Sequence, residues 1–201
     1  DGTLFDTQTP VHAAAETEVL AEIGIKVTPN DISARFAGIS TKKVFQELAP
    51  GYDPEKLLQR KWEIVRERID IPQKPLAGMY ELLSFLKSQN ASLAIASASP
   101  KWYIERLLEH SIEDHRSFKN PLKNFIFEKN CVSAEEVLRG KPAPDVFLLA
   151  AERLGKTPQD CIVIGDGHSD VHGGLAADMK VIFLGFVLLY DTYRHWMDVV
   201  N

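Results

Sequence analysis

The sequence predicts an α/β protein in which helices cover a parallel β-sheet and a second domain is helical. Two patterns predict this fold. From residue 75 onward, helical segments alternate with short apolar runs, as in a parallel sheet that helices bury on both faces. Before that point, the chain reads as three or four helices in succession. We therefore expect an α/β core of residues 1–8 and 75–201 and a helical domain of residues 9–74.

The helical domain carries recognisable helix boundaries. Helices are expected over residues 11–23, 41–49 and 54–69. Thr9 is a capping residue followed by Pro10 at the first helical position, and Gly24 ends that helix. Ser40 and Asp53 are the expected N-caps of the next two helices.

The last of these helices has an apolar and a basic face. Its apolar residues recur at helical spacing and predict a buried face, formed by Leu57, Leu58, Trp62 and Val65. Its basic residues are interpreted as a solvated face: Arg60, Lys61, Arg66 and Arg68. Trp62, Trp102 and Phe85 have apolar neighbours at helical spacing, which indicates core packing more than an aromatic binding platform.

Four strands of the core are predicted from short, nearly continuous apolar or β-branched runs. They cover residues 92–96, 125–132, 161–164 and 181–184. The intervening helices are expected over residues 78–88, 101–109, 144–154 and 169–177. The polar stretch at residues 114–124, which contains Pro121, is expected to be a loop.

Composition and charge restrict the function. The 201 residues contain 23 Lys and Arg and 28 Asp and Glu, a formal net charge of −5, which disfavours nucleic acid as a partner. The longest apolar run, residues 181–190, contains Gly185 and is too short for a membrane span of roughly 20 residues, so no membrane association is expected. Cys131 and Cys161 lie in apolar stretches, which favours reduced thiols and a cytoplasmic location. The start at Asp1 lacks a signal-peptide pattern and is interpreted as cut, not processed.

Chemistry-bearing side chains follow two of the predicted strands. Ligands of open α/β sheets bind beyond the carboxyl ends of the strands. Ser97 and Ser99 follow the first predicted strand at the start of a helix, where hydroxyls and free backbone N–H groups can hold a phosphate. Asp166 and Asp170 follow the third on a Gly-rich turn, where carboxylates suit a hard cation such as Mg²⁺.

Two further groups complete this set of residues. Lys141 lies in a Pro-stiffened segment just ahead of a helix, and Asp1 supplies a carboxylate on a Gly turn at the start of the chain. An anion cradle, a cation site, an ammonium group and an extra carboxylate together indicate phosphoryl transfer, because that chemistry depends mainly on positioning and charge stabilisation. Asp6 is interpreted as a turn or hinge residue and is not assigned to the catalytic set.

The order of these motifs resembles that of the haloacid-dehalogenase-like phosphohydrolase superfamily. The motifs are Asp1-Gly2-Thr3, the strand-end Ser97, residues 140–145 (GKPAPD) and residues 165–170 (GDGHSD). The stretches IASASP and GKPAPDVF look closest to the branch of sugar-phosphate phosphatases, phosphoglycolate phosphatases and β-phosphoglucomutase. The resemblance implies a doubly wound parallel sheet, with a helical cap inserted directly after the first motif.

The resemblance also implies a role for each residue at the phosphate. Asp1 would be the second Asp of the family's D-x-D-G-T motif, which protonates the leaving group and later activates water. Ser97 would hydrogen-bond the transferring phosphoryl group, and Lys141 would neutralise its charge. Ser99 would be an additional phosphate donor.

The implied cofactor is Mg²⁺. Asp166 would ligate the ion, Asp170 would ligate it or orient a ligating water, and the backbone carbonyl of Asp1 would face it. The activity implied is a Mg²⁺-dependent phosphatase that hydrolyses a small phosphorylated metabolite, such as a sugar phosphate or phosphoglycolate, through an aspartyl-phosphate. We expect a monomer or homodimer.

One residue of the family's catalytic set is not in this sequence. The nucleophilic Asp of the family lies two positions before the residue that Asp1 matches, and the strand that carries it precedes it. As written, the chain is therefore expected to be inactive. The helical segment and the downstream motifs are intact, so a truncated sequence is favoured over a natural protein that lacks its central strand.

Two alternatives remain open. A sugar-phosphate mutase of the β-phosphoglucomutase type would carry Arg after a Gly-x-Ser in the cap, whereas Gly38-Ile39-Ser40 is followed here by Thr41. Lys42 or Lys43 could substitute for that Arg. A catalytically dead binding protein with the same fold is the second alternative, and the residue two positions before Asp1 distinguishes it from the enzyme.

Three histidines could take part in a site. His168 and His172 have the four-residue spacing of a zinc pair, but no third nitrogen or sulfur ligand accompanies them, so we favour polar surface residues. His12, at the start of the first cap helix, is expected at the junction of cap and core, where packing and substrate contact are equally compatible with its position.

Overall fold

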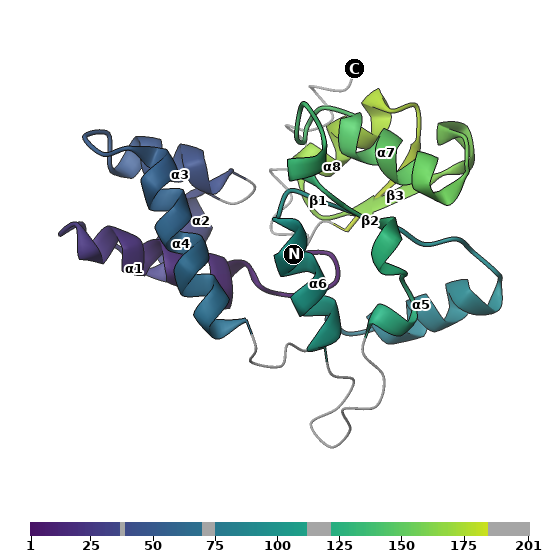
Figure 1. Ribbon diagram of the computed structural model, residues 1–201, viewed down its shortest axis with the longest axis horizontal. Coiled ribbons are helices and arrows are strands. Elements are labelled where there is room, and N and C mark those ends of the chain that lie inside the picture. Colours follow the sequence, from purple (N-terminus) through teal and green to yellow (C-terminus); the bar gives the residue numbers. More distant parts are fainter. Residues whose placement is uncertain (37–38, 70–74, 112–121, 185–201) are drawn as a thin grey trace, which may run out of the picture.

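The computed structural model describes residues 1–36, 39–69, 75–111 and 122–184, which form two lobes (Figure 1). The longer helices are α1 (Ala14–Glu22), α2 (Pro29–Phe36), α3 (Thr41–Leu48), α4 (Pro54–Arg68), α5 (Met79–Ser88), α6 (Lys101–Glu109), α7 (Asp145–Leu154) and α8 (His168–Ala176). The strands are β1 (Ile95–Ser97), β2 (Cys131–Ser133), β3 (Ile162–Gly165) and β4 (Lys180–Phe183). Short helices are η1 (Gln8–Ala13), η2 (Leu122–Asn124), η3 (Glu128–Asn130), η4 (Ala134–Glu136) and η5 (Pro158–Asp160).

The helical lobe consists of η1 and α1–α4, on the left of Figure 1. Its first helix begins differently from the prediction. A π-helical turn, η1, starts at Gln8, so Thr9 lies inside it and the side chain of Thr9 hydrogen-bonds Ser33 Oγ at 2.9 Å instead of capping a helix. The predicted Thr9 cap is therefore wrong, because the helix begins before it and a contact with α2 engages the hydroxyl.

The other two predicted caps have different outcomes. Asp53 accepts a hydrogen bond from the backbone N–H of Glu55 at 2.9 Å, which confirms it as the N-cap of α4. Ser40 occupies the N-cap position of α3, but its side chain makes no capping hydrogen bond. The sequence analysis placed no separate helix at α2.

The buried face of α4 differs from the predicted one at four residues: Lys61 and Ile64 are buried, and Leu58 and Trp62 are only partly buried. Leu57 and Val65 are buried as predicted, but Lys61 is also buried, with 1% of its surface exposed. The prediction of a solvated Lys61 is wrong because the residue lies on the buried side of α4, where its Nζ contacts His12 in η1. Phe85 on α5 is 59% exposed, so its predicted core position is wrong as well.

The four strands form two parallel pairs. β1 pairs with β2, with Ala96 opposite Val132, and β3 pairs with β4, with Val163 opposite Val181. Within the described ranges the two pairs are separate sheets. Parallel strands with helical connections confirm the predicted α/β class.

The second strand is much shorter than the predicted run over residues 125–132. The chain forms a 3₁₀ turn at η3 before β2 begins, and Phe127 is 71% exposed. Asn130 Nδ2 donates to the carbonyl oxygen of Leu93 at 3.1 Å and holds this turn beside the segment that leads to β1. Part of the apolar run at residues 125–132 therefore forms a turn and not a strand, and its apolar side chains do not all enter the core.

Buried side chains form one large cluster and two smaller ones. The large cluster runs from the helical lobe into the α6 and β2 region and includes Leu20, Phe45, Ile64, Tyr103, Leu107 and Cys131. A second cluster packs α7 and α8 against β3 and includes Phe147 and Val163, and a third lies between α7 and the β1–β2 pair. The lobes are therefore joined by apolar packing as well as by the chain.

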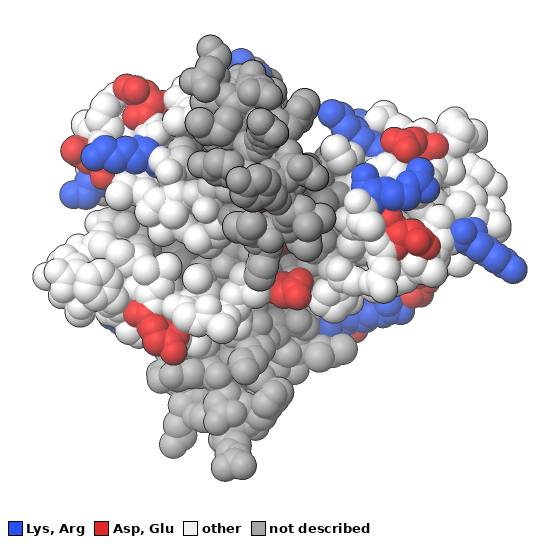
Figure 2. Space-filling model, turned by 180° about the vertical axis from the view of Figure 1, so that it is seen from behind, with Lys and Arg blue, Asp and Glu red and all other residues white. Residues whose placement is uncertain are grey.

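Several expectations fall outside the described residues or stay untested. Lys74, at the predicted domain boundary, most of the predicted loop at residues 114–124, and residues 185–201 lie outside them. None of the helices in the described ranges has the length and apolar character needed to cross a membrane. Acidic and basic side chains are interspersed over the described part of the face in Figure 2. The absence of a nucleic-acid partner stays a prediction.

The contact of α8 with its sheet gives a stability prediction. A Cβ built on Gly174 would lie 2.7 Å from Val181 Cγ2 and 3.1 Å from Val163 Cγ2. We expect Gly174→Ala to lower the free energy of unfolding by about 1–3 kcal/mol through overpacking, although Ala favours a helix by roughly 1 kcal/mol. Urea denaturation measures this. The control is Gly51→Ala, whose Cβ would meet no atom within 4 Å, and equal midpoints for the two variants would contradict the packing account.

Candidate active site

Lys141 connects the ends of the two strand pairs. It lies just ahead of α7, and its side chain is only 12% exposed. Its Nζ donates to the carbonyl oxygen of Ala96 in β1 at 2.8 Å and to Asp170 Oδ1 in α8 at 2.6 Å. One ammonium group therefore lies between the strand that ends at Ser97 and the helix that follows β3.

Asp170 is held in place from two sides. It is buried, and its Oδ2 accepts from the backbone N–H of Gly167 at 3.0 Å, at the first turn of α8. A Cβ on Gly165 would lie 2.5 Å from the Cβ of Asp170, so only glycine leaves room for this approach. The turn that follows β3 thus directs Asp170 toward Lys141.

Asp166 lies on the same turn and meets the start of the chain. Its Oδ1 accepts from Thr3 Oγ1 at 2.7 Å. Gly2 has a φ of +68°, and a Cβ there would lie 1.9 Å from Asp166 Oδ2. Glycine is needed at this position both for its backbone conformation and for the space that the carboxylate occupies.

The side chain of Asp1 is surrounded by donors. Its Oδ2 accepts from Ser99 Oγ at 2.7 Å, and its Oδ1 accepts from Tyr103 OH at 2.9 Å and from Thr7 Oγ1. His12 Nε2 lies 3.1 Å from the same Oδ1, a close electrostatic contact without hydrogen-bond geometry. Burial raises the pKa of the Tyr103 phenol, which keeps its hydroxyl protonated as a donor.

The two serines at the end of β1 and just beyond it, Ser97 and Ser99, belong to the same set of contacts. Ser97 Oγ accepts from the backbone N–H of Ser99 at 3.1 Å. The Ser99 hydroxyl donates to Asp1, and its carbonyl oxygen accepts from Ser133 Oγ at 2.8 Å. Together with the short stretches of backbone at residues 96–97, 166–167 and 1–3, these contacts close a ring that contains every residue of the predicted site: Asp1, Ser97, Ser99, Lys141, Asp166 and Asp170.

Sequence reasoning missed Lys61 and Tyr103 at this site. Lys61 Nζ lies 2.8 Å from His12 Nδ1 and 3.5 Å from the centroid of the Trp62 ring. Burial lowers the pKa of Lys61 to about 7, and burial followed by the charge of Lys61 lowers the pKa of His12 well below its usual value. No local sequence pattern identifies Lys61 or Tyr103 as part of the site. His12 was expected at the junction of the lobes, and its contact with Asp1 agrees with that position.

The oxygen donors suit magnesium, although no three-ligand cluster is formed. In the described ranges, no group of three or more His, Cys, Asp or Glu side chains is arranged to hold a metal ion. Mg²⁺ commonly binds one or two protein carboxylates and completes its shell with water and substrate phosphate. Asp166 and Asp170 supply two carboxylates from one turn and therefore fit this ion. His168 and His172 are both exposed, as expected for polar surface residues.

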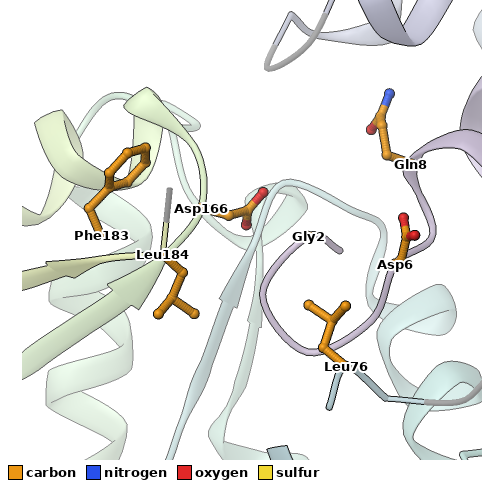
Figure 3. Close-up of a pocket in the computed structure, with 7 residues that line it drawn as sticks. All are labelled: Gly2, Asp6, Gln8, Leu76, Asp166, Phe183 and Leu184. Atoms are coloured by element: carbon orange, nitrogen blue, oxygen red, sulfur yellow. The ribbon is translucent and has the colours of Figure 1, made fainter. Parts of the chain in front are cut away.

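A pocket opens beside Asp166 (Figure 3). Its volume is about 430 Å³, and it is lined by Gly2, Asp6, Gln8, Leu76, Asp166, Phe183 and Leu184. Asp6 and Gln8 come from the segment that leaves the core for the helical lobe, and Phe183 and Leu184 from the end of β4. The pocket thus joins the predicted metal and phosphate region to the junction of the two lobes.

Comparison with known protein families shows to which family this chain belongs. Residues 1–184 match the haloacid dehalogenase-like hydrolase family. The chain belongs to the haloacid dehalogenase-like hydrolases. The relatives of this hydrolase include fructose-1-phosphate phosphatase YqaB of Escherichia coli, which is 31% identical over 190 residues and covers 90% of the chain and 91% of the relative.

A second relative is much longer than this hydrolase. Protein SUPPRESSOR OF QUENCHING 1 of Arabidopsis thaliana is 29% identical over 189 residues, which cover 90% of the chain and only 17% of that protein. Among solved structures, a haloacid dehalogenase-like protein of unknown function from Agrobacterium tumefaciens has a TM-score of 0.70 at 27% identity. It covers 91% of this chain and 78% of its own. The likeness supports the hydrolase fold over nearly the whole chain.

The buried Lys61 gives a pH prediction. Between pH 7 and its usual pKa of 10.5, the unfolded chain keeps a proton that folded Lys61 has released, so this group makes folding more favourable as pH rises. Relative to Lys61→Met, the wild type should gain stability over this range, with a slope of at most about 1.4 kcal/mol per pH unit. Urea denaturation at several pH values measures the difference.

The matched control is Lys43→Met, since Lys43 is exposed and should show no such dependence. If the difference in the free energy of unfolding between the wild type and Lys61→Met stays constant with pH, Lys61 is not buried as described.

Proposed function

We propose that this hydrolase is a Mg²⁺-dependent phosphatase that acts on a small phosphorylated metabolite through an aspartyl-phosphate. The observation that carries the proposal is the position of Lys141, whose Nζ contacts both the end of β1 and Asp170. A cation between two strand ends, beside two carboxylates and a strand-end hydroxyl, suits a phosphoryl group that gains and loses negative charge.

The roles of the residues at the phosphate follow from their contacts. Lys141 offers a fixed positive charge to the phosphoryl oxygens, and Ser97 offers a hydroxyl donor. Ser99 would be an additional donor on giving up its hydrogen bond to Asp1, because a hydroxyl has a single proton to donate. Asp1 is the acid and base: it protonates the leaving oxygen and later takes a proton from water. Thr7, Tyr103 and Ser99 hold its carboxylate, and Thr7 lies where the chain enters the helical lobe, toward which the organic part of a substrate would extend.

The cofactor would be held by Asp166, Asp170 and the backbone carbonyl of Asp1. Bound Mg²⁺ would neutralise charge on the phosphoryl oxygens. Thr3 and Gly2 position Asp166, and Lys141 and Gly167 position Asp170, so both carboxylates are already oriented.

The nucleophile is assigned to the family position two residues before Asp1, which this sequence does not include. The 201 residues are therefore proposed to bind phosphate without turning over an ester. Residues 9–74 are proposed to be the cap, with its boundaries at residues 8 and 75, and to exclude bulk water from the site. A residue other than Asp at the nucleophile position would favour the dead binding protein.

A mutase is less favoured than a phosphatase. A mutase of the β-phosphoglucomutase type needs a cation in the cap for a second phosphate, and Thr41 supplies none. The hydroxyl of Thr41 donates to Glu16 at 2.6 Å, and Lys42 pairs with Glu55 on the lobe surface. Of the two lysines that could take the place of the mutase Arg, Lys43 therefore remains the candidate.

The proposal also covers the location, the partners and the oligomeric state of the protein. Burial raises the pKa of the Cys131 thiol to about 11, which keeps this cysteine unreactive and agrees with the proposed cytoplasmic location. The partner is proposed to be a small phosphorylated metabolite and not nucleic acid or a membrane, with the chain as a monomer or homodimer.

The test restores the missing part of the family's site. The chain, extended upstream by the first strand and its Asp, should release phosphate from an aryl phosphate in Mg²⁺ and not in EDTA. Asp166→Asn should lower kcat/KM by roughly 100-fold or more, because it removes a charge that holds the ion. The matched control is Glu152→Gln on the exposed side of α7, which should keep the wild-type rate. Activity that survives both EDTA and Asp166→Asn would refute the role of the metal.

A further inference from the structure

The two oxygens of the Asp1 carboxylate have unequal surroundings. Oδ1 accepts from Tyr103 OH at 2.9 Å and from Thr7 Oγ1, and His12 Nε2 lies 3.1 Å away. Oδ2 has a single side-chain donor within the described ranges, Ser99 Oγ at 2.7 Å. The carboxylate is therefore held more firmly at Oδ1 than at Oδ2.

We propose that Tyr103 is a positioning residue: together with Thr7 it holds Oδ1 of Asp1, and so leaves Oδ2 as the oxygen that gives up and takes back the proton. This inference rests on the proposed function, since it takes Asp1 to be the acid and base. It assigns the proton to one atom and gives a role to a tyrosine that lies outside the sequence motifs.

The packing around Tyr103 keeps its hydroxyl on Oδ1. Tyr103 is 1% exposed and Thr7 is 0% exposed. The centroid of the Tyr103 ring lies 5.5 Å from that of Trp62, on α4 of the helical lobe, and 6.0 Å from that of Trp102, on α6. A tightly packed ring has little freedom to turn, and a buried hydroxyl that left its acceptor would be unsatisfied, which is unfavourable. Both donors are therefore fixed on Oδ1.

These donors also determine where a proton can bind. Each oxygen of a carboxylate has about two lone-pair sites. Tyr103 and Thr7 occupy both sites of Oδ1, so a proton there would displace a buried donor. A proton on Oδ2 displaces only the hydroxyl of Ser99, which can then donate to a phosphoryl oxygen. Oδ2 is therefore the oxygen that can be protonated without leaving a buried hydroxyl unpaired.

The proton transfer balances on this oxygen. In ester cleavage the carboxylate nucleophile of the proposed function forms a bond to phosphorus, and the bond between phosphorus and the leaving oxygen breaks. The electron pair of that bond stays on the leaving oxygen, which takes the proton from Oδ2 and leaves Asp1 ionised. In hydrolysis of the aspartyl-phosphate, Oδ2 takes a proton from the attacking water. Tyr103 keeps its own proton in both steps.

The test compares two esters that differ in their need for that proton. The leaving group of 4-nitrophenyl phosphate departs readily as an anion, whereas that of phenyl phosphate depends more on protonation. In the chain extended upstream by the first strand and its Asp, kcat/KM measures the ester-cleaving step. Tyr103→Phe should lower it roughly tenfold for phenyl phosphate, as expected for a lost hydrogen bond to a charged group. For 4-nitrophenyl phosphate the loss should be less than about twofold.

A second variant and two controls complete the experiment. Thr7→Val removes the other hydroxyl donor at Oδ1 and should show the same dependence on the leaving group. Tyr52→Phe makes the same change as Tyr103→Phe on a tyrosine that is 49% exposed, and should keep the wild-type kcat/KM for both esters. Inorganic phosphate in Mg²⁺ should bind the 201-residue chain and its Tyr103→Phe variant with similar Kd.

The outcomes separate this inference from the proposed function. If the extended wild-type chain cleaves neither ester, the proposed function is refuted, and this inference with it. If the chain is active but Tyr103→Phe and Thr7→Val lower kcat/KM equally for the two esters, or lower neither, the inference alone is refuted. Loss of phosphate binding in Tyr103→Phe would assign the tyrosine a purely structural role and would refute the inference as well.

Discussion

The pair of hydrogen bonds from Lys141 Nζ is the interaction on which the site depends. One ends on a backbone carbonyl of β1 and the other on Asp170, at the start of α8. In the described ranges β1 and β3 belong to separate strand pairs, and Lys141 links β1 to the helix that follows β3. Removing the amine would leave a buried carboxylate without its cation, which is unfavourable for folding as well as for anion binding.

The glycines around the site make these contacts possible. Asp166 and Asp170 each occupy the space that the Cβ of another residue would fill, at Gly2 and Gly165. The turn after β3 can therefore direct two carboxylates toward the start of the chain and toward Lys141. The adjacent pocket lies between Asp166 and the entry to the helical lobe (Figure 3).

The parts of the fold that local patterns specify were predictable. The helix at α6 has the predicted bounds, and the motif residues lie on one ring of contacts because the motifs lie at or just beyond the carboxyl ends of parallel strands. Lys61 was not predictable, since its burial depends on how α4 packs and not on its neighbours in sequence. Tyr103 likewise contacts Asp1 through tertiary packing. The apolar run before β2 was predicted as a strand but forms a turn. The catalytic and metal roles of the ring residues stay predictions.

A crystal structure of the chain with inorganic phosphate and Mg²⁺ tests the central claim most directly. The account predicts one phosphate with an oxygen about 3 Å from Lys141 Nζ, within reach of the Ser97 hydroxyl, and Mg²⁺ on Asp166 between the two strand pairs. Phosphate bound elsewhere, with Lys141 still directed only at Ala96 and Asp170, would contradict it.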